Sequence, residues 1–238
     1  MSAWNEQELE LMAPAFAFFD VDGTLLRMRS MFAFEDYWLD RQQHNGDPDS
    51  RSRREQRLEV LAGLGQLPRE LANRAFYRGF AGRDRRAVER GIRAWYRELR
   101  SSGTPYLRRE TVRVLRALQR QGIEPVLVSG SFVELLRPFA EELGIRHILA
   151  TRPVVRGHSY TGELDGPPMI GEGKRLAVVD FMARQGASPA DCHACGDHVS
   201  DAAMLGSVGS AIVVAGDPAL DELARVRGWQ VVQAEVTR

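Results

Sequence analysis

The stretch of sequence that decides the fold is AFAFFDVDGT, residues 15–24. Its first half is apolar and rich in Phe, which predicts a buried strand. Asp20 and Asp22 follow this strand at once, and Gly23 allows the backbone to turn tightly behind them. Such a turn can direct both carboxylates towards one reacting centre. Paired carboxylates in this position suit metal binding, nucleophilic attack and proton transfer.

The composition is that of an ordinary globular chain. Its 238 residues suffice for one large domain or for a core with a smaller insertion. The formal net charge is zero, so we expect no general attraction to nucleic acid or to membrane surfaces. No apolar stretch reaches about 20 residues, and the acidic N-terminal segment 1–12 lacks the pattern of a signal peptide. We therefore expect no stable membrane insertion and a cytoplasmic location, and the oligomeric state stays open.

The two cysteines, Cys192 and Cys195, are spaced as a CxxC pair. Such a pair can be a redox couple or half of a metal site. Because no second pair is present and the motif lies in a predicted strand, we expect two reduced, structural thiols.

Strand and helix signals alternate along most of the chain. Strands are expected at 15–19, 125–128, 147–150, 193–195, 210–214 and 229–232, helices at 111–121, 132–143, 174–185, 202–205 and 218–227, and a hairpin at 154–164. This order predicts an α/β fold, with a Rossmann-like, mostly parallel sheet and helices on both faces. Such sheets bind ligands at the carboxyl ends of their strands, which is where Asp20, Ser129 and Asp197 fall.

The segment between the first two strands differs, because it is helical and rich in arginine. We expect helices at 32–43, 53–64, 68–80 and 83–100, and a loop at 46–50. This predicts an all-helical cap at 29–105, inserted after the first strand, with 1–28 and 106–238 forming a discontinuous core. The bulky apolar side chains of 31–38 are expected to form the cap's own core.

Four short segments occur in an order that points to phosphate chemistry. They are DVDGT at 20–24, VLVSGS at 126–131, GEGK at 171–174 and GDHVSD at 196–201. This series resembles the motifs of the haloacid dehalogenase superfamily, and the resemblance extends over residues 15–232. The helical insertion between the first two motifs is similar to that of the phosphoserine-phosphatase-like branch. The resemblance implies a phosphomonoesterase that acts through an aspartyl-phosphate.

The chemistry can also be argued from the residues. A phosphate monoester is a dianion, so a site must offset its charge before a carboxylate can attack. Lys174 supplies one positive charge, and Mg²⁺ would supply two. We predict metal ligands at Asp20, the Val21 carbonyl, Asp22, Asp197 and Asp201. The Ser129 hydroxyl and the turn amides near Gly23 and Gly130 are expected to donate to phosphate oxygens, and Arg29 is a further binding candidate.

The resemblance also implies individual roles. It makes Asp20 the nucleophile and Asp22 the general acid, which later acts as the base that activates water. Lys174 is expected to be catalytic through its charge. Asp201 is expected to support the site by a hydrogen bond to Lys174 or through a metal-bound water, and His198 is expected to fill the rim.

The substrate class is less closely defined by these residues. Phosphoserine phosphatases place a glutamate shortly after the aspartate pair, where it holds the substrate's amino group. Here residues 27–31 contain no acid, and the first one beyond them is Glu35. We therefore expect a small phosphorylated metabolite other than phosphoserine. Its leaving group could meet Arg27, Arg29 or the arginines at 53, 54 and 57.

Two other functions stay open. One is transfer of the phosphoryl group to a second hydroxyl, as in mutase-like relatives. The other is a catalytically silent binding module on the same fold. A dehalogenase is less favoured, because Asp22 and the acidic metal pair have no obvious purpose in that reaction.

Overall fold

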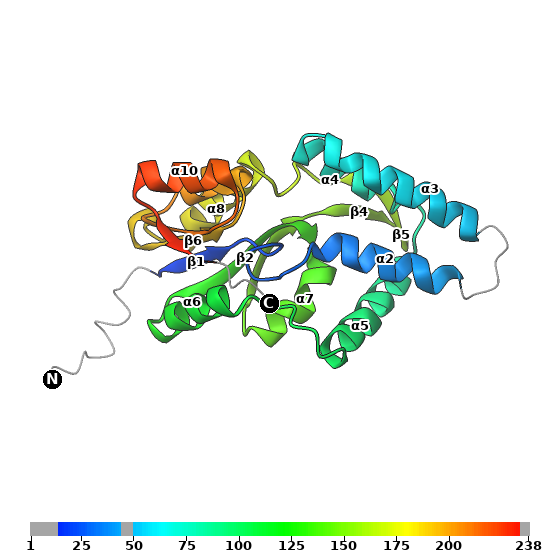
Figure 1. The fold of residues 1–238 in the computed structure, drawn as a ribbon, viewed down its shortest axis with the longest axis horizontal. Helices are drawn as coiled ribbons and strands as arrows, with labels where there is room; N and C mark the ends of the chain where they lie inside the picture. Colours follow the sequence, from blue (N-terminus) through cyan, green and yellow to red (C-terminus); the bar gives the residue numbers. More distant parts are fainter. Residues whose placement is uncertain (1–13, 44–49, 234–238) are drawn as a thin grey trace.

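The structure of the protein, a computed structural model, describes residues 14–43 and 50–233. The expectations for the N-terminal segment 1–12 and for nearly all of the loop at 46–50 lie outside these ranges. A parallel sheet with its helices occupies one side of the molecule, and a helical cap occupies the other (Figure 1).

Six parallel strands form the main sheet, in the order β3-β2-β1-β6-β7-β8. Their bounds are β1 Phe16–Phe19, β2 Glu124–Phe132, β3 His147–Thr151, β6 His193–Gly196, β7 Ser210–Val214 and β8 Gln230–Val232. β1 pairs with β2 on one side and with β6 on the other, so the strand order reverses here. Parallel sheets bind ligands beyond the carboxyl ends of their strands at such a switch point.

Alternate side chains of β1 enter two separate apolar cores, one on each face of the sheet. Ala17 and Phe19 join the core on the face of α6 (Arg109–Arg120) and α7 (Val133–Glu142). Phe16 and Phe18 join the other core. That core packs under α8 Glu172–Gln185, α9 Ala202–Leu205 and α10 Pro218–Arg227. Burial on both faces explains why this strand is a continuous apolar run, and the predicted α/β class is confirmed.

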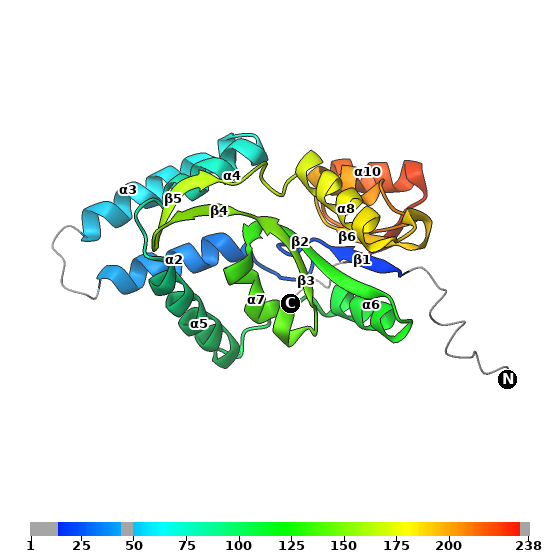
Figure 2. The same ribbon diagram turned by 180° about the vertical axis from the view of Figure 1, so that it is seen from behind.

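The cap contains helices and the predicted hairpin. The helices are α2 Ser30–Gln43, α3 Ser50–Gly63, α4 Arg69–Arg78 and α5 Arg85–Ser101, with a 3₁₀ turn at Leu64–Gln66. The hairpin strands are β4 Pro153–Arg156 and β5 Ser159–Leu164. β5 packs against α4 (Figure 2), and the N–H of Gly82 donates to the Tyr160 carbonyl at 2.9 Å. The hairpin therefore packs with the helical insertion, although it falls in the sequence range that we assigned to the core.

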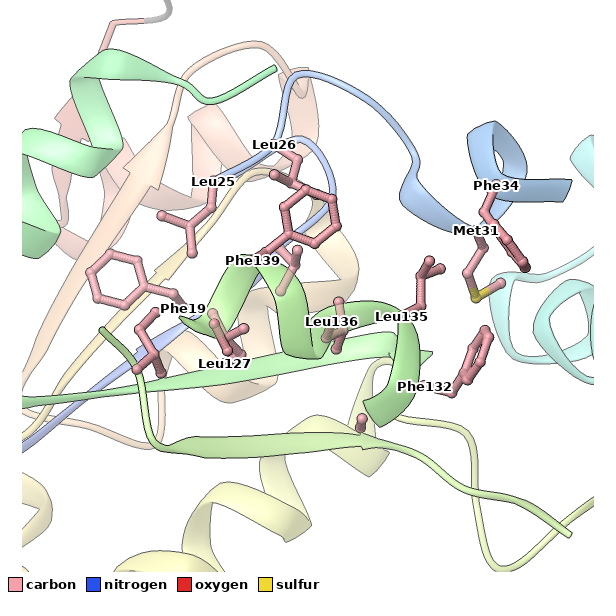
Figure 3. Packing of buried hydrophobic residues seen from close by; sticks show 14 of the residues in the cluster. Phe19, Leu25, Leu26, Met31, Phe34, Leu127, Phe132, Leu135, Leu136 and Phe139 are labelled. Carbon is pink, nitrogen blue, oxygen red and sulfur yellow. The ribbon is translucent and has the colours of Figure 1, made fainter. Parts of the chain in front are cut away.

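An apolar cluster runs without interruption from the sheet into the cap (Figure 3). Phe19 and Leu127 lie on the sheet, Leu136 on α7, and Met31 and Phe34 on α2. Met31 and Phe34 are both buried. The prediction that the bulky apolar residues of 31–38 form core is confirmed for these two, and the base of the cap is packed firmly onto α7.

Two features of the described residues concern membrane spanning and the cysteines. None of the described helices is both long and apolar enough to cross a lipid bilayer. Cys192 and Cys195 are free, buried thiols beside and within β6, as predicted. Burial raises the pKa of both thiols, so both stay protonated and unreactive near neutral pH.

Candidate active site

Neighbouring strands of the sheet bring the predicted catalytic segments together. Asp20 follows β1, Ser129 lies in the irregular last part of β2, and Asp197 follows β6. The backbone N–H of Asp20 donates to the carbonyl of Cys195, at the end of β6, at 2.9 Å. Segments that are far apart in the sequence therefore meet at one edge of the sheet.

Carboxyl groups gather at this edge. Asp20, Asp197 and Asp201 each offer an oxygen atom, and these atoms lie within 4.8 Å of one another. Asp20 is 7% exposed and Asp201 is 2% exposed. Burial raises the pKa of all three carboxyl groups, because their charged forms lose solvation there. Buried carboxylates in this number require positive charge close by.

The protein supplies that charge through Lys174, the only lysine in the sequence. Lys174 lies in the first turn of α8 and is 3% exposed. Its ammonium group donates to the carboxylates of Asp20 and Asp201, the latter at 2.7 Å. Although burial opposes the charge, these carboxylates hold the pKa of Lys174 above its ordinary value. The predicted hydrogen bond between Asp201 and Lys174 is confirmed. We call Asp20, Asp197, Asp201 and Lys174 the acidic cluster.

Gly23 allows the loop after β1 to approach Asp197. Its φ of +91° lies in the region that disfavours side chains. A Cβ atom at Gly23 would lie only 2.2 Å from Oδ2 of Asp197. The next residue, Thr24, is fully buried, and its hydroxyl donates to Oδ1 of Asp197 at 2.9 Å. The turn therefore holds Asp197 in place, and only glycine fits at position 23.

Asp22 lies beside the acidic cluster and is not among the three carboxyl groups that share it. Its Oδ1 accepts a hydrogen bond from the backbone N–H of Ser30 at 3.0 Å, which orients the carboxyl group. Burial raises the pKa of Asp22 to about 6, and the Ser30 amide partly opposes this shift. A carboxyl group with this pKa can both give and take a proton near neutral pH. The geometry suits the Asp22 side chain to proton transfer more than to metal binding.

The end of β2 is arranged to donate hydrogen bonds. Ser129 is buried, and its hydroxyl oxygen accepts from the backbone N–H of Ser131 at 3.0 Å. Accepting this bond leaves the hydroxyl hydrogen available for a ligand. The cap fixes the next residue, since the Gly130 carbonyl accepts from Nδ2 of Asn73 at 2.9 Å and from the Tyr77 hydroxyl at 3.0 Å.

Three other predicted residues have different surroundings. The Val21 carbonyl accepts from the N–H groups of Leu25 and Leu26 at 2.9 and 2.8 Å, so the turn occupies this oxygen and metal binding by it is not favoured. Arg29 is exposed, one residue before α2. The His198 side chain is 40% exposed, in keeping with a rim residue.

Glu35, the acid that follows the aspartate pair, is fully buried inside the cap. Its carboxylate accepts from Nε of Arg57 at 2.7 Å and from Nη1 and Nη2 of Arg83 at 2.7 and 2.6 Å. Although burial disfavours the charge, Arg83 and Arg57 hold the pKa of Glu35 below its ordinary value. We call these three residues the cap triad. Arg57 is thus engaged in the cap, Arg54 lies 3.7 Å from Asp36, and the side chain at 53 is outside the described part.

Several groups that orient the site give little signal in the sequence. They are the Thr24 hydroxyl, the Ser30 amide, Asn73 and Tyr77. A backbone amide such as that of Ser30 cannot be singled out by residue type. Asn73 offers one usable signal, because this amide lies three and four residues before the aromatic residues Phe76 and Tyr77 and so shares their helix face.

The acidic cluster fits a hard divalent cation. Three carboxylates against one ammonium leave two negative charges in a buried place. Carboxylate oxygens are the ligands that Mg²⁺ prefers, at about 2.0–2.1 Å, and waters commonly complete its shell. Opposite ligands of such an ion lie about 4.2 Å apart, and these oxygens lie within 4.8 Å of one another, so they are close enough to share one ion.

A family model for haloacid dehalogenase-like hydrolases matches residues 17–206, a range that includes all four motifs. The chain therefore belongs to this family of hydrolases. A protein from Mycobacterium tuberculosis (strain ATCC 25618 / H37Rv), named a probable phosphatase, is 32% identical over 216 residues. That match covers 91% of this chain and 74% of the relative.

Solved structures agree with this assignment. A crystal structure of a protein of unknown function from Bordetella pertussis Tohama I has a TM-score of 0.76 at 29% identity, and the match covers 93% of this chain and 99% of that one. A phosphoserine phosphatase, solved as an analogue of its phospho-aspartyl intermediate, has a TM-score of 0.65 at 18% identity over 94% and 95% of the two chains. At this identity the second likeness concerns the fold alone.

Proposed function

We propose that this protein is a Mg²⁺-dependent phosphatase that hydrolyses a small phosphate monoester through an aspartyl-phosphate intermediate. The observation that carries the proposal is the meeting of three buried carboxylates and a buried ammonium at the switch point of a parallel sheet. Membership of the haloacid dehalogenase-like hydrolases and the relative named a probable phosphatase support the same class of reaction.

Asp20, Asp197 and Asp201 are the residues that we propose to hold the cation. Bound there, Mg²⁺ would offset the charge of the substrate dianion. We omit the Val21 carbonyl from this set, because two backbone N–H groups already bind it. We also omit the Asp22 side chain, which binds Ser30 and lies beside the cluster.

Asp20 is the proposed nucleophile. Its carboxylate oxygen forms a bond to phosphorus while the bond from phosphorus to the leaving oxygen breaks. Attack requires the ionised carboxylate, and the hydrogen bond from the Lys174 ammonium favours that form. Lys174 and the Ser129 hydroxyl then stabilise the negative charge on the transferring phosphoryl group.

Asp22 is the proposed acid and base. Its pKa of about 6 gives it a protonated fraction near neutral pH, from which it protonates the leaving oxygen. The same carboxylate, now ionised, accepts a proton from the water that attacks the aspartyl-phosphate. The water oxygen bonds to phosphorus, the bond to Asp20 breaks, and inorganic phosphate leaves.

The cap is proposed to cover the reacting groups and to open for exchange of substrate and product. Asn73 and Tyr77 bind the Gly130 carbonyl from above the phosphate-binding segment, which supports such a role. Glu35 is engaged by two arginines, so it is not expected to hold an ammonium group of the substrate. A substrate other than phosphoserine is favoured for this reason.

Phosphate release from p-nitrophenyl phosphate, with Mg²⁺ and without an acceptor alcohol, tests the proposal. We expect turnover by the wild type and a loss of about 10⁴-fold or more in Asp20→Asn, with an unchanged far-UV circular dichroism spectrum. Release without an acceptor also separates hydrolysis from phosphoryl transfer. No release from this compound or from a panel of phosphorylated metabolites would contradict the proposal and favour a silent binding module.

A further inference from the structure

One face of α4 lies over the loops that form the candidate active site. Arg69, Asn73 and Tyr77 follow one another at intervals of four residues and so share this face. Nη1 of Arg69 donates to the Ser200 hydroxyl at 3.1 Å, while Asn73 and Tyr77 donate to the Gly130 carbonyl. The helix therefore extends from the end of β2 to the loop after β6.

The first turn of α4 also approaches the start of α8, where Lys174 lies. A Cβ atom on Gly171 would lie 2.7 Å from Oε1 of Glu70. Arg69 and Glu70 are both exposed, but neighbouring helix positions point in different directions. Glu70 faces α8, whereas Arg69 faces the loop after β6. Arg69 therefore lies at the mouth of the site.

Two further basic residues belong to the loops around the site. His198 is in the loop after β6, and its Nδ1 lies 3.1 Å from the same Ser200 hydroxyl that Arg69 binds. Arg29 directly precedes Ser30, whose N–H binds the carboxyl group of Asp22. Basic residues from two separate segments, α4 and the loop before α2, are thus joined to the loops of the site, and Arg29 directly precedes the residue whose amide binds the proposed acid.

Several cap arginines have their charge balanced by a carboxylate, whereas among the described residues the two arginines near the site do not. Ion pairs of 2.5–3.7 Å to carboxylates are formed by Arg41, Arg54, Arg57, Arg83 and Arg85. Within residues 14–43 and 50–233, neither Arg29 nor Arg69 has such a pair, and Arg69 binds a neutral hydroxyl. Their charge is therefore available to an incoming anion.

We propose that Arg69 and Arg29 select phosphate monoesters that carry a second anionic group, such as a carboxylate, in the leaving group. This inference rests on the proposed phosphatase function. The phosphoryl group would occupy the inner site next to Asp20 and Ser129, so the rest of the substrate extends to the rim. A guanidinium group offers several N–H donors in one plane and matches a carboxylate with two parallel hydrogen bonds.

Competition against p-nitrophenyl phosphate hydrolysis tests this selection, because release of p-nitrophenol reports how strongly a competitor occupies the site without requiring its turnover. Two matched pairs exchange a carboxylate for a hydroxymethyl group. They are 2-phosphoglycolate with 2-hydroxyethyl phosphate, and 3-phosphoglycerate with glycerol 1-phosphate. In at least one pair we expect the inhibition constant of the carboxylate member to be lower than that of its partner by about tenfold or more. The ratio of the two inhibition constants should become smaller at high salt.

The variants Arg69→Gln and Arg29→Gln should each reduce this ratio by about threefold or more, and the double variant should bring it close to one. Because the ratio compares two ligands in the same variant, a general loosening of the cap changes both inhibition constants alike and leaves their ratio unchanged. Arg78→Gln is the matched control. It removes the same charge from the far end of α4, where the backbone of residue 78 lies against Gly162, and should keep the wild-type ratio.

A ratio near one for both pairs in the wild type would overturn the inference and leave the phosphatase function intact. The wild-type ratio retained in the double variant would do the same. Absence of p-nitrophenyl phosphate hydrolysis by the wild type would instead contradict the proposed function, and the anion selection would fall with it.

Discussion

The acidic cluster and the cap triad are both buried, but their charges are balanced in opposite ways. The acidic cluster has three carboxylates and one ammonium group. The cap triad has one carboxylate between two guanidinium groups, at 2.6–2.7 Å. With all groups ionised, the acidic cluster carries a net charge of −2, whereas the cap triad carries a net charge of +1.

The surroundings of the cap triad accommodate its excess charge. The Arg83 guanidinium lies 4.4 Å from the ring centroid of Phe80, and that of Arg57 lies 5.1 Å from the centroid of Phe76. Aromatic faces attract cations, so these rings complete the triad. The acidic cluster has no comparable compensation among the described residues apart from Lys174. The cap triad is therefore complete as a structural element, and the acidic cluster is built to take a cation and an anionic substrate.

The largest expected effect comes from breaking the cap triad. Glu35→Gln leaves two buried guanidinium groups without their carboxylate, and we expect unfolding to become easier by about 3–5 kcal/mol. Urea unfolding monitored by circular dichroism measures this loss. Glu98→Gln is the control, because it breaks an exposed pair with Arg41 and should change stability little. Equal stability of Glu35→Gln and the wild type would contradict a structural role for the triad.

The comparison of the wild type with Glu35→Gln also predicts a pH dependence of the stability. Because the pKa of Glu35 is lower in the folded state, its stabilisation is present above the unfolded value of about 4.3 and is lost as the pH falls through the folded value. The stability difference between the wild type and Glu35→Gln should therefore shrink below about pH 4. A difference that stays constant between pH 7 and pH 3 would disprove this linkage.

These comparisons also explain what could be predicted from the sequence. The fold could be predicted from the alternation of strands and helices. Most of the site could be predicted from the aspartates that follow two of the central strands, because a parallel sheet brings the ends of its strands together. The structure disfavours the Val21 carbonyl as a metal ligand, and the sequence could not show this, since it does not reveal which backbone oxygens a turn occupies. The role of Glu35 was not predictable for a similar reason. Its partners Arg57 and Arg83 come from the far side of the cap and meet it only after folding.

The second effect concerns Lys174, the one lysine in a chain with otherwise only arginine as a strong base. Lys174→Arg keeps the charge but places a larger, planar group between Asp20 and Asp201. We expect a loss of about 10²–10³-fold in kcat for p-nitrophenyl phosphate. Retention of more than half of the wild-type kcat would show that only the charge of Lys174 matters. It would contradict the view that the acidic cluster requires the size and shape of a lysine.

The third effect is the pH dependence of the reaction. Since protonated Asp22 is required in the first step and its pKa is about 6, kcat/KM should fall about tenfold per pH unit above this value. An alkyl phosphate with a poor leaving group shows this alkaline limb of the pH profile of kcat/KM most clearly. Asp22→Asn should remove the limb as well as most of the activity. A limb that persists in Asp22→Asn would assign the ionisation to another group.

The central claim is that the acidic cluster takes one divalent cation, and a calorimetric titration with Mg²⁺ tests it most directly. We expect one Mg²⁺ per wild-type chain. In Asp197→Asn we expect the affinity for Mg²⁺ to fall by about tenfold or more. The apo form of this variant should be no less stable than the wild type, because the change removes repulsion between buried carboxylates. Absence of Mg²⁺ binding by the wild type, or an identical isotherm for Asp197→Asn, would contradict the account.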